Sequence, residues 1–316
     1  MKRLLSVLCI LAVISSCSKK DHTIIQPAPA VLPDTLSAGW SKLVFHGSGF
    51  NDIFFIDNNV GYATGVGIYK STNGGVSWTR LSAMPVNGEN IGAFGNSLCA
   101  TSFDQTPYRS QDGGVNFQTN GVGSGPASDC FYTSASVCFL TGPYQISKST
   151  DGGQTFPFTQ PFTDNSEYSS LFFLNSTTGW NIRTTGIYKT TDAGATWTLL
   201  HTISGLPSAV DFLDNSNGYY SSYDSYGNSA VYKTVNGGAT WTLVFQTGNS
   251  NFNDIAFVSV NEGYVSAGKR IFKTTDAGST WNVVAALGNA SVTEIHFTDA
   301  AHGWASDSDS TILRFQ

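Results

Sequence analysis

Four acidic residues occupy equivalent places in a repeated sequence, each just before an apolar run: Asp52, Asp129, Asp254 and Glu294. Paired carboxyl groups serve glycosidases as acid, base or nucleophile, and carboxyl clusters also bind cations or basic protein groups. A structural interpretation is equally open, in which these side chains cap backbone N–H groups where strands begin. The sequence does not set the distances between them, so these interpretations remain alternatives.

Further polar and aromatic residues stand in short loops that we expect to face the same way. Tyrosines with mixed charges suit a protein or glycan surface, because amphipathic rings supply contact area and fixed charges orient the partner. The longest of these loops, 222–229, is the preferred contact loop, with a solvated insertion as the alternative. The candidate binding face therefore adds Arg183, Tyr223, Asp224, Tyr226, Lys269 and Arg270.

Other chemistry is not visible in the sequence. The five histidines have no metal-ligand spacing, and the glycine pairs lack the context of a phosphate-binding loop or a serine-nucleophile turn. A net charge of −6 argues against nucleic-acid binding, which needs a basic surface. We therefore expect no catalytic residues, no cofactor and no metal, and enzyme status stays open with a lean towards a non-enzyme.

The loops belong to a repeat that spans most of the chain. One segment, residues 68–78, recurs six times with the pattern S/T-x-D/N-x-G-x-T/S-W/F. The acidic or amide side chain of each copy would accept hydrogen bonds from its own turn, and glycine would supply the positive-φ position. These residues are interpreted as hairpin clasps and not as catalytic acids. They are Asn73, Asp112, Asp151, Asp192, Asn236 and Asp276.

A second element precedes each box and occurs seven times: an apolar strand, a turn, and a glycine–aromatic pair such as Gly61-Tyr62 or Gly303-Trp304. In two copies the pair degenerates to Leu98-Cys99 and Val137-Cys138. The last repeat lacks a box and a fourth strand. The segment around Trp40 resembles the fourth strand of the fifth repeat, so we expect it to complete the last one.

A cation recurs in the third strand of every repeat. In one interpretation the seven cations together form a basic ring. In the other, which we favour, the aliphatic part of each side chain lies over a nearby box aromatic. The seven cations are Lys70, Arg109, Lys148, Lys189, Lys233, Lys273 and Arg314.

These patterns predict an all-β fold: a seven-bladed β-propeller with four antiparallel strands per blade, closed by an N-terminal strand that completes the last blade. The composition agrees, because 33 glycines and only 12% charged residues favour strands and turns over long helices. Closing the ring in this way avoids a free sheet edge between blades.

The N-terminus predicts export. Lys2 and Arg3 precede an apolar stretch that is too short to span a bilayer, and the sequence before Cys17 resembles a bacterial lipobox. We expect a signal peptide over 1–16, a lipidated Cys17 with a proline-containing tether over 17–37, and the propeller over 38–316. This predicts an outer-membrane lipoprotein facing the periplasm or the outside.

The six boxes with their glycine–aromatic strands resemble the Asp-box, or BNR-repeat, propellers of the photosystem II stability/assembly-factor type, and more distantly those of sialidases, xyloglucan hydrolases and sortilin-type receptors. The resemblance implies an assembly or binding role. Members of the first family are reported to use an arginine-rich patch, whereas this body has five arginines, so the photosystem partner is not carried over.

We therefore expect a lipid-anchored cell-envelope propeller with a monomeric body. It would act as a non-enzymatic protein-binding or assembly module, with an envelope protein or glycan as partner. The alternative is a carbohydrate-binding or glycoside-hydrolysing surface lipoprotein that uses the acidic residues at the channel mouth.

Overall fold

The structure, a computed structural model, describes residues 33–44, 49–81, 88–103, 106–119, 127–162, 166, 169–203, 205–224, 226, 228–248, 250–309 and 311–316. The expected signal peptide, Cys17 and most of the tether lie outside this part of the chain. Within it, no helix is long and apolar enough to cross a membrane.

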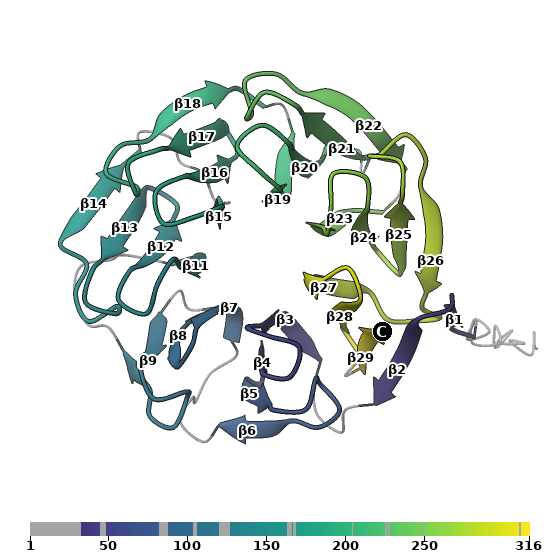
Figure 1. Cartoon of the computed structure of the whole chain (residues 1–316), viewed down its shortest axis with the longest axis horizontal. Coiled ribbons are helices and arrows are strands. Elements are labelled where there is room, and N and C mark those ends of the chain that lie inside the picture. The colour runs from purple at the N-terminus through teal and green to yellow at the C-terminus, as the bar shows by residue number, and fades with distance from the viewer. Residues whose placement is uncertain are drawn as a thin grey trace, which may run out of the picture. The chain divides into compact units, whose positions relative to one another are not determined.

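Seven antiparallel sheets are arranged around a central opening, with the first strand of each sheet innermost (Figure 1). Blades one to three comprise β3 (Phe50–Phe55), β4 (Gly61–Gly65), β5 (Gly67–Ser71) and β6 (Thr79–Leu81); β7 (Gly88–Phe94), β8 (Ser97–Ser102), β9 (Pro107–Ser110) and β10 (Gln118–Thr119); and β11 (Asp129–Tyr132), β12 (Cys138–Gly142), β13 (Gln145–Ser149) and β14 (Phe158–Pro161). The predicted seven-bladed propeller with four-stranded blades is confirmed.

Blades four to six follow the same order along the chain. They comprise β15 (Ser169–Phe173), β16 (Gly179–Arg183), β17 (Gly186–Thr190) and β18 (Thr198–His201); β19 (Leu206–Phe212), β20 (Gly218–Tyr223), β21 (Ser229–Thr234) and β22 (Thr242–Thr247); and β23 (Phe252–Phe257), β24 (Gly263–Ala267), β25 (Arg270–Thr274) and β26 (Asn282–Ala286).

Blade seven is built from both ends of the described chain. β27 (Val292–Asp299), β28 (His302–Asp307) and β29 (Thr311–Phe315) are completed by β2 (Trp40–Val44), in a register from Trp40↔Phe315 to Val44↔Thr311. The Trp40 ring meets Phe297 at 87°, as the box residue Trp281 meets Phe257 at 87°. Closure by the N-terminal strand is confirmed, and Trp40 also replaces the missing box aromatic.

Residues just before the expected boundary at 38 also pair with the propeller. β1 (Thr35–Leu36) pairs with β26 and makes blade six a five-stranded sheet. Asp34 accepts hydrogen bonds from the Gly288 amide at 2.9 Å and the Lys42 ammonium at 2.5 Å. The outer edge of blade six offers unpaired backbone groups, which this segment satisfies. The same short stretch therefore joins blades six and seven.

Aromatic stacking between neighbouring blades repeats around the ring. An aromatic residue of the second strand lies flat on a phenylalanine of the next blade's inner strand, and this contact buries both rings between the blades. The centroid distances are 3.6 Å for Trp304–Phe55, 4.4 Å for Phe139–Phe173, 3.6 Å for Trp180–Phe212, 3.5 Å for Tyr219–Phe257 and 4.3 Å for Tyr264–Phe297. In blade three the stacking residue is thus Phe139 and not the adjacent Cys138.

Four of these five aromatics, all except Phe139, follow a glycine that the packing requires. A Cβ at Gly263 would lie 2.4 Å from the Phe257 ring, and a Cβ at Gly303 would lie 2.3 Å from Phe297. Only a residue without a side chain leaves room for the phenylalanine to lie across the hairpin.

The six box turns are held by local hydrogen bonds. In the fourth blade, Asp192 accepts bonds from the Thr196 amide at 2.9 Å and from the Thr190 hydroxyl at 2.8 Å, and that hydroxyl accepts the Gly194 amide. Such bonds to the charged form lower the pKa of Asp112, Asp151 and Asp192 to about 2. Ala193 adopts a positive φ of 58°, where four of the other boxes have glycine.

The five lysines among the repeated cations lie over second-strand aromatics, which corrects the expectation that they cover a box aromatic. The Lys70 ammonium is 5.3 Å from the centroid of Tyr62. The Lys148 ammonium is 5.8 Å from Phe139 and donates to the Ala193 carbonyl, in the next blade's box turn, at 2.7 Å. Lys70 and Lys233 likewise donate to a carbonyl of the next blade's box turn, so these three lysines link neighbouring blades.

We predict that Trp40→Ala lowers the free energy of unfolding by about 3–5 kcal/mol, because it empties a buried site at the seam where the ring closes. Lys42→Ala in the same strand is the control and should cost at most about 1 kcal/mol, since its ion pair is partly exposed. Denaturant unfolding measures both. Equal, small effects would contradict the closure described here.

We predict that Gly263→Ala destabilises the protein by about 1–3 kcal/mol, because its methyl group would collide with the Phe257 ring. Gly248→Ala is the matched control, since a Cβ there meets only the Asn228 side chain at 3.6 Å. Thermal unfolding compares the two variants, and a neutral Gly263→Ala would show that the ring stack tolerates displacement.

Candidate functional site

The inner strands surround a central cavity of about 580 Å³. Side chains of a strand alternate between two faces, so every second residue of an inner strand points into this cavity. In β3 the buried Ile53 and Phe55 pack between blades, whereas the partly exposed Asp52 and Phe54 line the cavity. Two levels result, one of carboxyl groups and one of aromatic rings.

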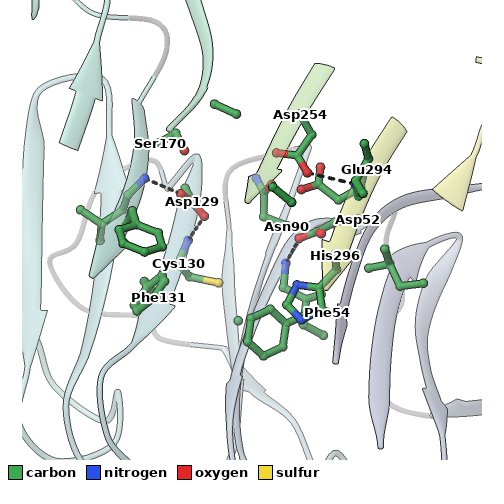
Figure 2. Close-up of a pocket in the computed structure, with 18 of the residues that line it drawn as sticks. Asp52, Phe54, Asn90, Asp129, Cys130, Phe131, Ser170, Asp254, Glu294 and His296 are labelled. Atoms are coloured by element: carbon green, nitrogen blue, oxygen red, sulfur yellow. Dashed lines mark hydrogen bonds between the residues drawn. The ribbon is translucent and has the colours of Figure 1, made fainter. Parts of the chain in front are cut away.

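The carboxyl level contains the four acids predicted from the sequence, and Figure 2 shows them from neighbouring inner strands. Three of the four accept a hydrogen bond from the next blade. Asp52 accepts the Ile91 amide at 2.7 Å, and Asp254 accepts the Ile295 amide at 2.9 Å. Asp129 accepts the Leu171 amide at 2.9 Å. These carboxyl groups cap backbone N–H groups, as in the structural interpretation, but the donor belongs to the adjacent blade.

Asp254 and Glu294 form a directly hydrogen-bonded carboxyl pair. Two carboxylates in contact cannot both be ionised, so the pair holds a proton. Burial raises the pKa of both groups, and in Glu294 the nearby charge of Asp254 adds to the effect.

Burial also raises the pKa of Asp52, Asp129 and Asp211 to about 7. For Asp52 the charges of Asp129 and Asp254 act in the same direction, while the bond from the Ile91 amide opposes the shift. These carboxyl groups are partly accessible from the cavity, yet the surrounding torus excludes most of the water that would solvate a charge.

Asp211 was missed by the sequence analysis. In blade five the position equivalent to Asp52 is Ala209. Both residues face the cavity, because they lie two positions apart in β19 after a register shift between Pro207 and Ala209. Asp211 accepts the Phe257 amide of the next blade at 2.6 Å. Glu89 also lines the cavity, and burial raises its pKa. Because every second residue of an inner strand faces the cavity, counting two residues on from Ala209 would have predicted Asp211.

The aromatic level consists of Phe54, Phe131 and Phe172, together with His296. The rings of Phe54 and His296 are 4.8 Å apart. His296 Nε2 lies 2.9 Å from the Phe55 carbonyl, and burial lowers the pKa of the imidazole to about 4. The ring is therefore neutral at pH 7, and Nε2–H donates to the carbonyl.

The predicted loop residues do not all reach the surface. Arg183 is completely buried, donates to the Gly142 and Pro143 carbonyls, and lies 4.1 Å from the Phe162 ring centroid, so it cannot serve as a contact residue. It links blade four to blade three instead. An arginine in a loop gave no sign in the sequence that it would be buried.

The remaining candidates lie on loops at the carboxyl end of the cavity. Tyr226 is 85% exposed, and Asp224 shapes its loop by accepting the Tyr226 and Asn228 amides. Tyr223 is half-buried. Lys269 and Arg270 are exposed, although the Lys269 ammonium donates to the Gly288 carbonyl at 3.0 Å. None of these five lines the cavity among the described residues. They surround its mouth and do not form one cluster with the acids.

Among the described residues no group of three or more His, Cys, Asp or Glu is placed to hold a metal ion.

Comparison with protein-family models finds no match, and comparison with curated proteins finds none either. Solved structures do match. One is "YCF48 bound to D1 peptide", with a TM-score of 0.71 and 16% identity over 90% of this chain and 98% of that chain. YCF48 from Cyanidioschyzon merolae gives 0.71 and 18% over 88% and 99%.

The GH74 enzyme of Niastella koreensis gives a TM-score of 0.68 and 19% identity over 86% of this chain and 52% of that chain. These likenesses confirm the predicted resemblance to propellers of the assembly-factor type at the level of fold.

We predict that the protein loses stability as the pH rises from 5 to 8. Asp52, Asp129 and Asp211 have pKa values of about 7 when folded, against about 3.9 for an unfolded aspartate. The folded state therefore holds protons that the unfolded state has lost, which costs at most about 1.4 kcal/mol per pH unit per group. His296 acts in the opposite direction, but only up to about pH 6.5.

Denaturant unfolding at pH 5, 6.5 and 8 measures this slope. Asp129→Asn should reduce it, because the amide oxygen can still accept the Leu171 amide but carries no charge. Asp309→Asn, at an exposed site outside the cavity, should leave it unchanged. A flat profile in the unmodified protein would contradict the raised pKa values.

Proposed function

We propose that this protein is a non-enzymatic protein-binding or assembly module of the cell envelope, anchored through a lipid on Cys17. Its partner engages the face at which the carboxyl end of the cavity opens. The anchor and the location rest on the lipobox-like sequence, and the binding role rests on the geometry of the cavity.

The main support for this proposal is that the carboxyl groups of the cavity are already hydrogen-bonded to the protein itself. Asp52, Asp129 and Asp211 each commit an oxygen to the backbone of the next blade. Asp254 and Glu294 touch one another, whereas glycosidase carboxyl groups stand about 5 Å or 6.5–9.5 Å apart. A pair in contact leaves no space for the sugar carbon or the water between them.

The face around the mouth offers contact area instead. Its loops between second and third strands lie at this end because Asp52 pairs with Thr64, next to the end of β4. They display Phe103 at 62% exposure and Tyr144 at 54%, in addition to Tyr226. Exposed aromatic residues are typical of protein interfaces. A structure of the same fold, YCF48, is described as bound to a D1 peptide, which supports a binding role.

A glycan-binding or glycoside-hydrolysing role is the second candidate. The chain shares its fold with GH74 enzymes, and carboxyl groups with pKa values near 7 retain a proton that a general acid could donate. This alternative places substrate in the cavity and needs Asp129 or Asp254.

We predict that the full-length protein, photo-crosslinked in envelope preparations, captures a reproducible protein partner through the mouth face. Tyr226→Ala combined with Phe103→Ala should reduce capture at least about tenfold, as expected for aromatic anchors. Val115→Ala is the matched control, because Val115 is exposed in a box turn on the other side. Capture that survives the double substitution, or that Val115→Ala weakens equally, would overturn the assigned face.

The glycan alternative is tested separately, by binding to and hydrolysis of xyloglucan and other envelope-relevant polysaccharides. Turnover that disappears in Asp254→Asn, with the fold intact, would favour the enzyme and contradict the proposal. Cys17→Ser should release the protein from membranes without changing its partner, which checks the anchor.

A further inference from the structure

The central cavity has a charge and a lining that go beyond the structural role of its carboxyl groups as acceptors of backbone amides. Six carboxyl groups line it, on Asp52, Glu89, Asp129, Asp211, Asp254 and Glu294. Among the described residues that line it there is no lysine or arginine, and His296 is neutral at pH 7. The capping bonds to Asp52 and Asp129 use backbone amides, which carry no full charge, so the negative charge of the cavity is not compensated from within.

The second level of the cavity is mainly aromatic, with Asp211 and His296 at the equivalent positions of their strands. Phe54, Phe131 and Phe172 are only partly buried and present their rings to the cavity. Aromatic faces attract organic cations and pack against methylene stems. The wall also holds Ser208, only 7% exposed, whose hydroxyl has no hydrogen-bond partner among the described residues. Buried hydroxyls without partners are rare, so this part of the wall holds an unsatisfied polar group.

We propose that the cavity receives a lysine or arginine side chain from the partner protein, with its methylene stem on the aromatic level and its charge among the carboxyl groups. This inference deepens the proposed binding function and rests on it. Charge complementarity identifies the occupant, because a negative cavity at the end of an aromatic-rimmed surface fits a basic side chain that projects from a docked segment. The volume of about 580 Å³ is ample for such a side chain.

A divalent metal ion fits the same cavity less well. Metal ions need several converging oxygens, and no such group is found among the described residues. One oxygen of Asp52, Asp129, Asp211 and Asp254 is already occupied by a backbone amide. The aromatic rings contribute nothing to metal coordination but favour an organic cation.

The test uses Nα-acetyl-L-lysine methylamide as probe and the full-length protein in detergent. Its matched control is Nα-acetyl-L-norleucine methylamide, which has the same stem but no ammonium group. Titration by ligand-observed NMR should show binding of the lysine probe and at least about tenfold weaker binding of the norleucine probe, as expected for a charge-assisted hydrogen bond. Equal binding of the two probes would overturn the proposal.

Two variants locate the site on different levels. Asp129→Asn should weaken the lysine probe about tenfold, and Phe131→Leu should weaken it without removing any charge. Asp309→Asn, exposed outside the cavity, is the control and should bind the probe normally. Thermal unfolding verifies that each variant is folded. The two variants alter different features of the cavity, because Phe131→Leu keeps every carboxyl group. Normal binding of the lysine probe by both variants would overturn the proposal. If one variant does not fold, normal binding by the other one is sufficient to do so.

The pH supplies an independent readout. A probe that requires one ionised carboxyl group of pKa about 7 should bind about tenfold more tightly at pH 8 than at pH 6, where the six carboxyl groups named above hold more protons. The lysine ammonium stays charged throughout this range. Binding that weakens at pH 8 would contradict the assignment.

Calcium chloride tests the metal alternative. If calcium ions stabilise the protein against unfolding and the lysine probe cannot displace them, the cavity is a metal site.

The partner experiment separates this inference from the proposed function. If Asp129→Asn and Phe131→Leu still capture the partner through the mouth face, the binding function stands and the basic side chain is wrong. If the lysine probe binds but no partner is captured, the cavity recognises cations and the proposed protein-binding function fails.

Discussion

The contact between a second-strand aromatic and the next blade's phenylalanine is the interaction on which the architecture depends. It recurs at centroid distances of 3.5–4.4 Å, and it requires a glycine wherever the phenylalanine lies across the hairpin. Because the stack fixes how closely one blade approaches the next, it also helps to fix the angle between them and therefore the width of the ring. The central cavity follows from this packing and not from any loop.

The carboxyl groups connect this packing to function. Asp52 and Asp254 hold neighbouring inner strands together, and the same groups give the cavity its charge. A carboxyl group that stabilises the ring by accepting an amide is also one that burial keeps from ionising freely. The scaffold therefore sets the protonation of its own binding site, and a cationic guest would favour the ionised form.

The fold could be predicted from the sequence because each repeat is locally consistent: the box turn, the glycine–aromatic pair and the alternation of the inner strand indicate the same hairpins. Closure by Trp40 was predictable because its segment matches another fourth strand. The site was predicted only in part. Asp52 and Asp254 could be placed because each stands just before an apolar run, whereas Asp211 lies two residues further along its strand, among apolar residues. The burial of Arg183 depends on carbonyl groups of the preceding blade, which no local pattern indicates.

The joining of blade seven from both ends of the chain has a consequence for how the protein folds. The Ser41 hydroxyl donates to the Arg314 carbonyl across 273 positions, so β2 must wait until β29 has been made. Contacts of such long sequence separation form late and slowly, and until then the outer strand of an incomplete ring has no neighbour. During synthesis from the N-terminus, β2 would stay unpaired until β29 has left the ribosome. Until then its exposed backbone groups could pair with another chain, so β29 determines when this risk of aggregation ends.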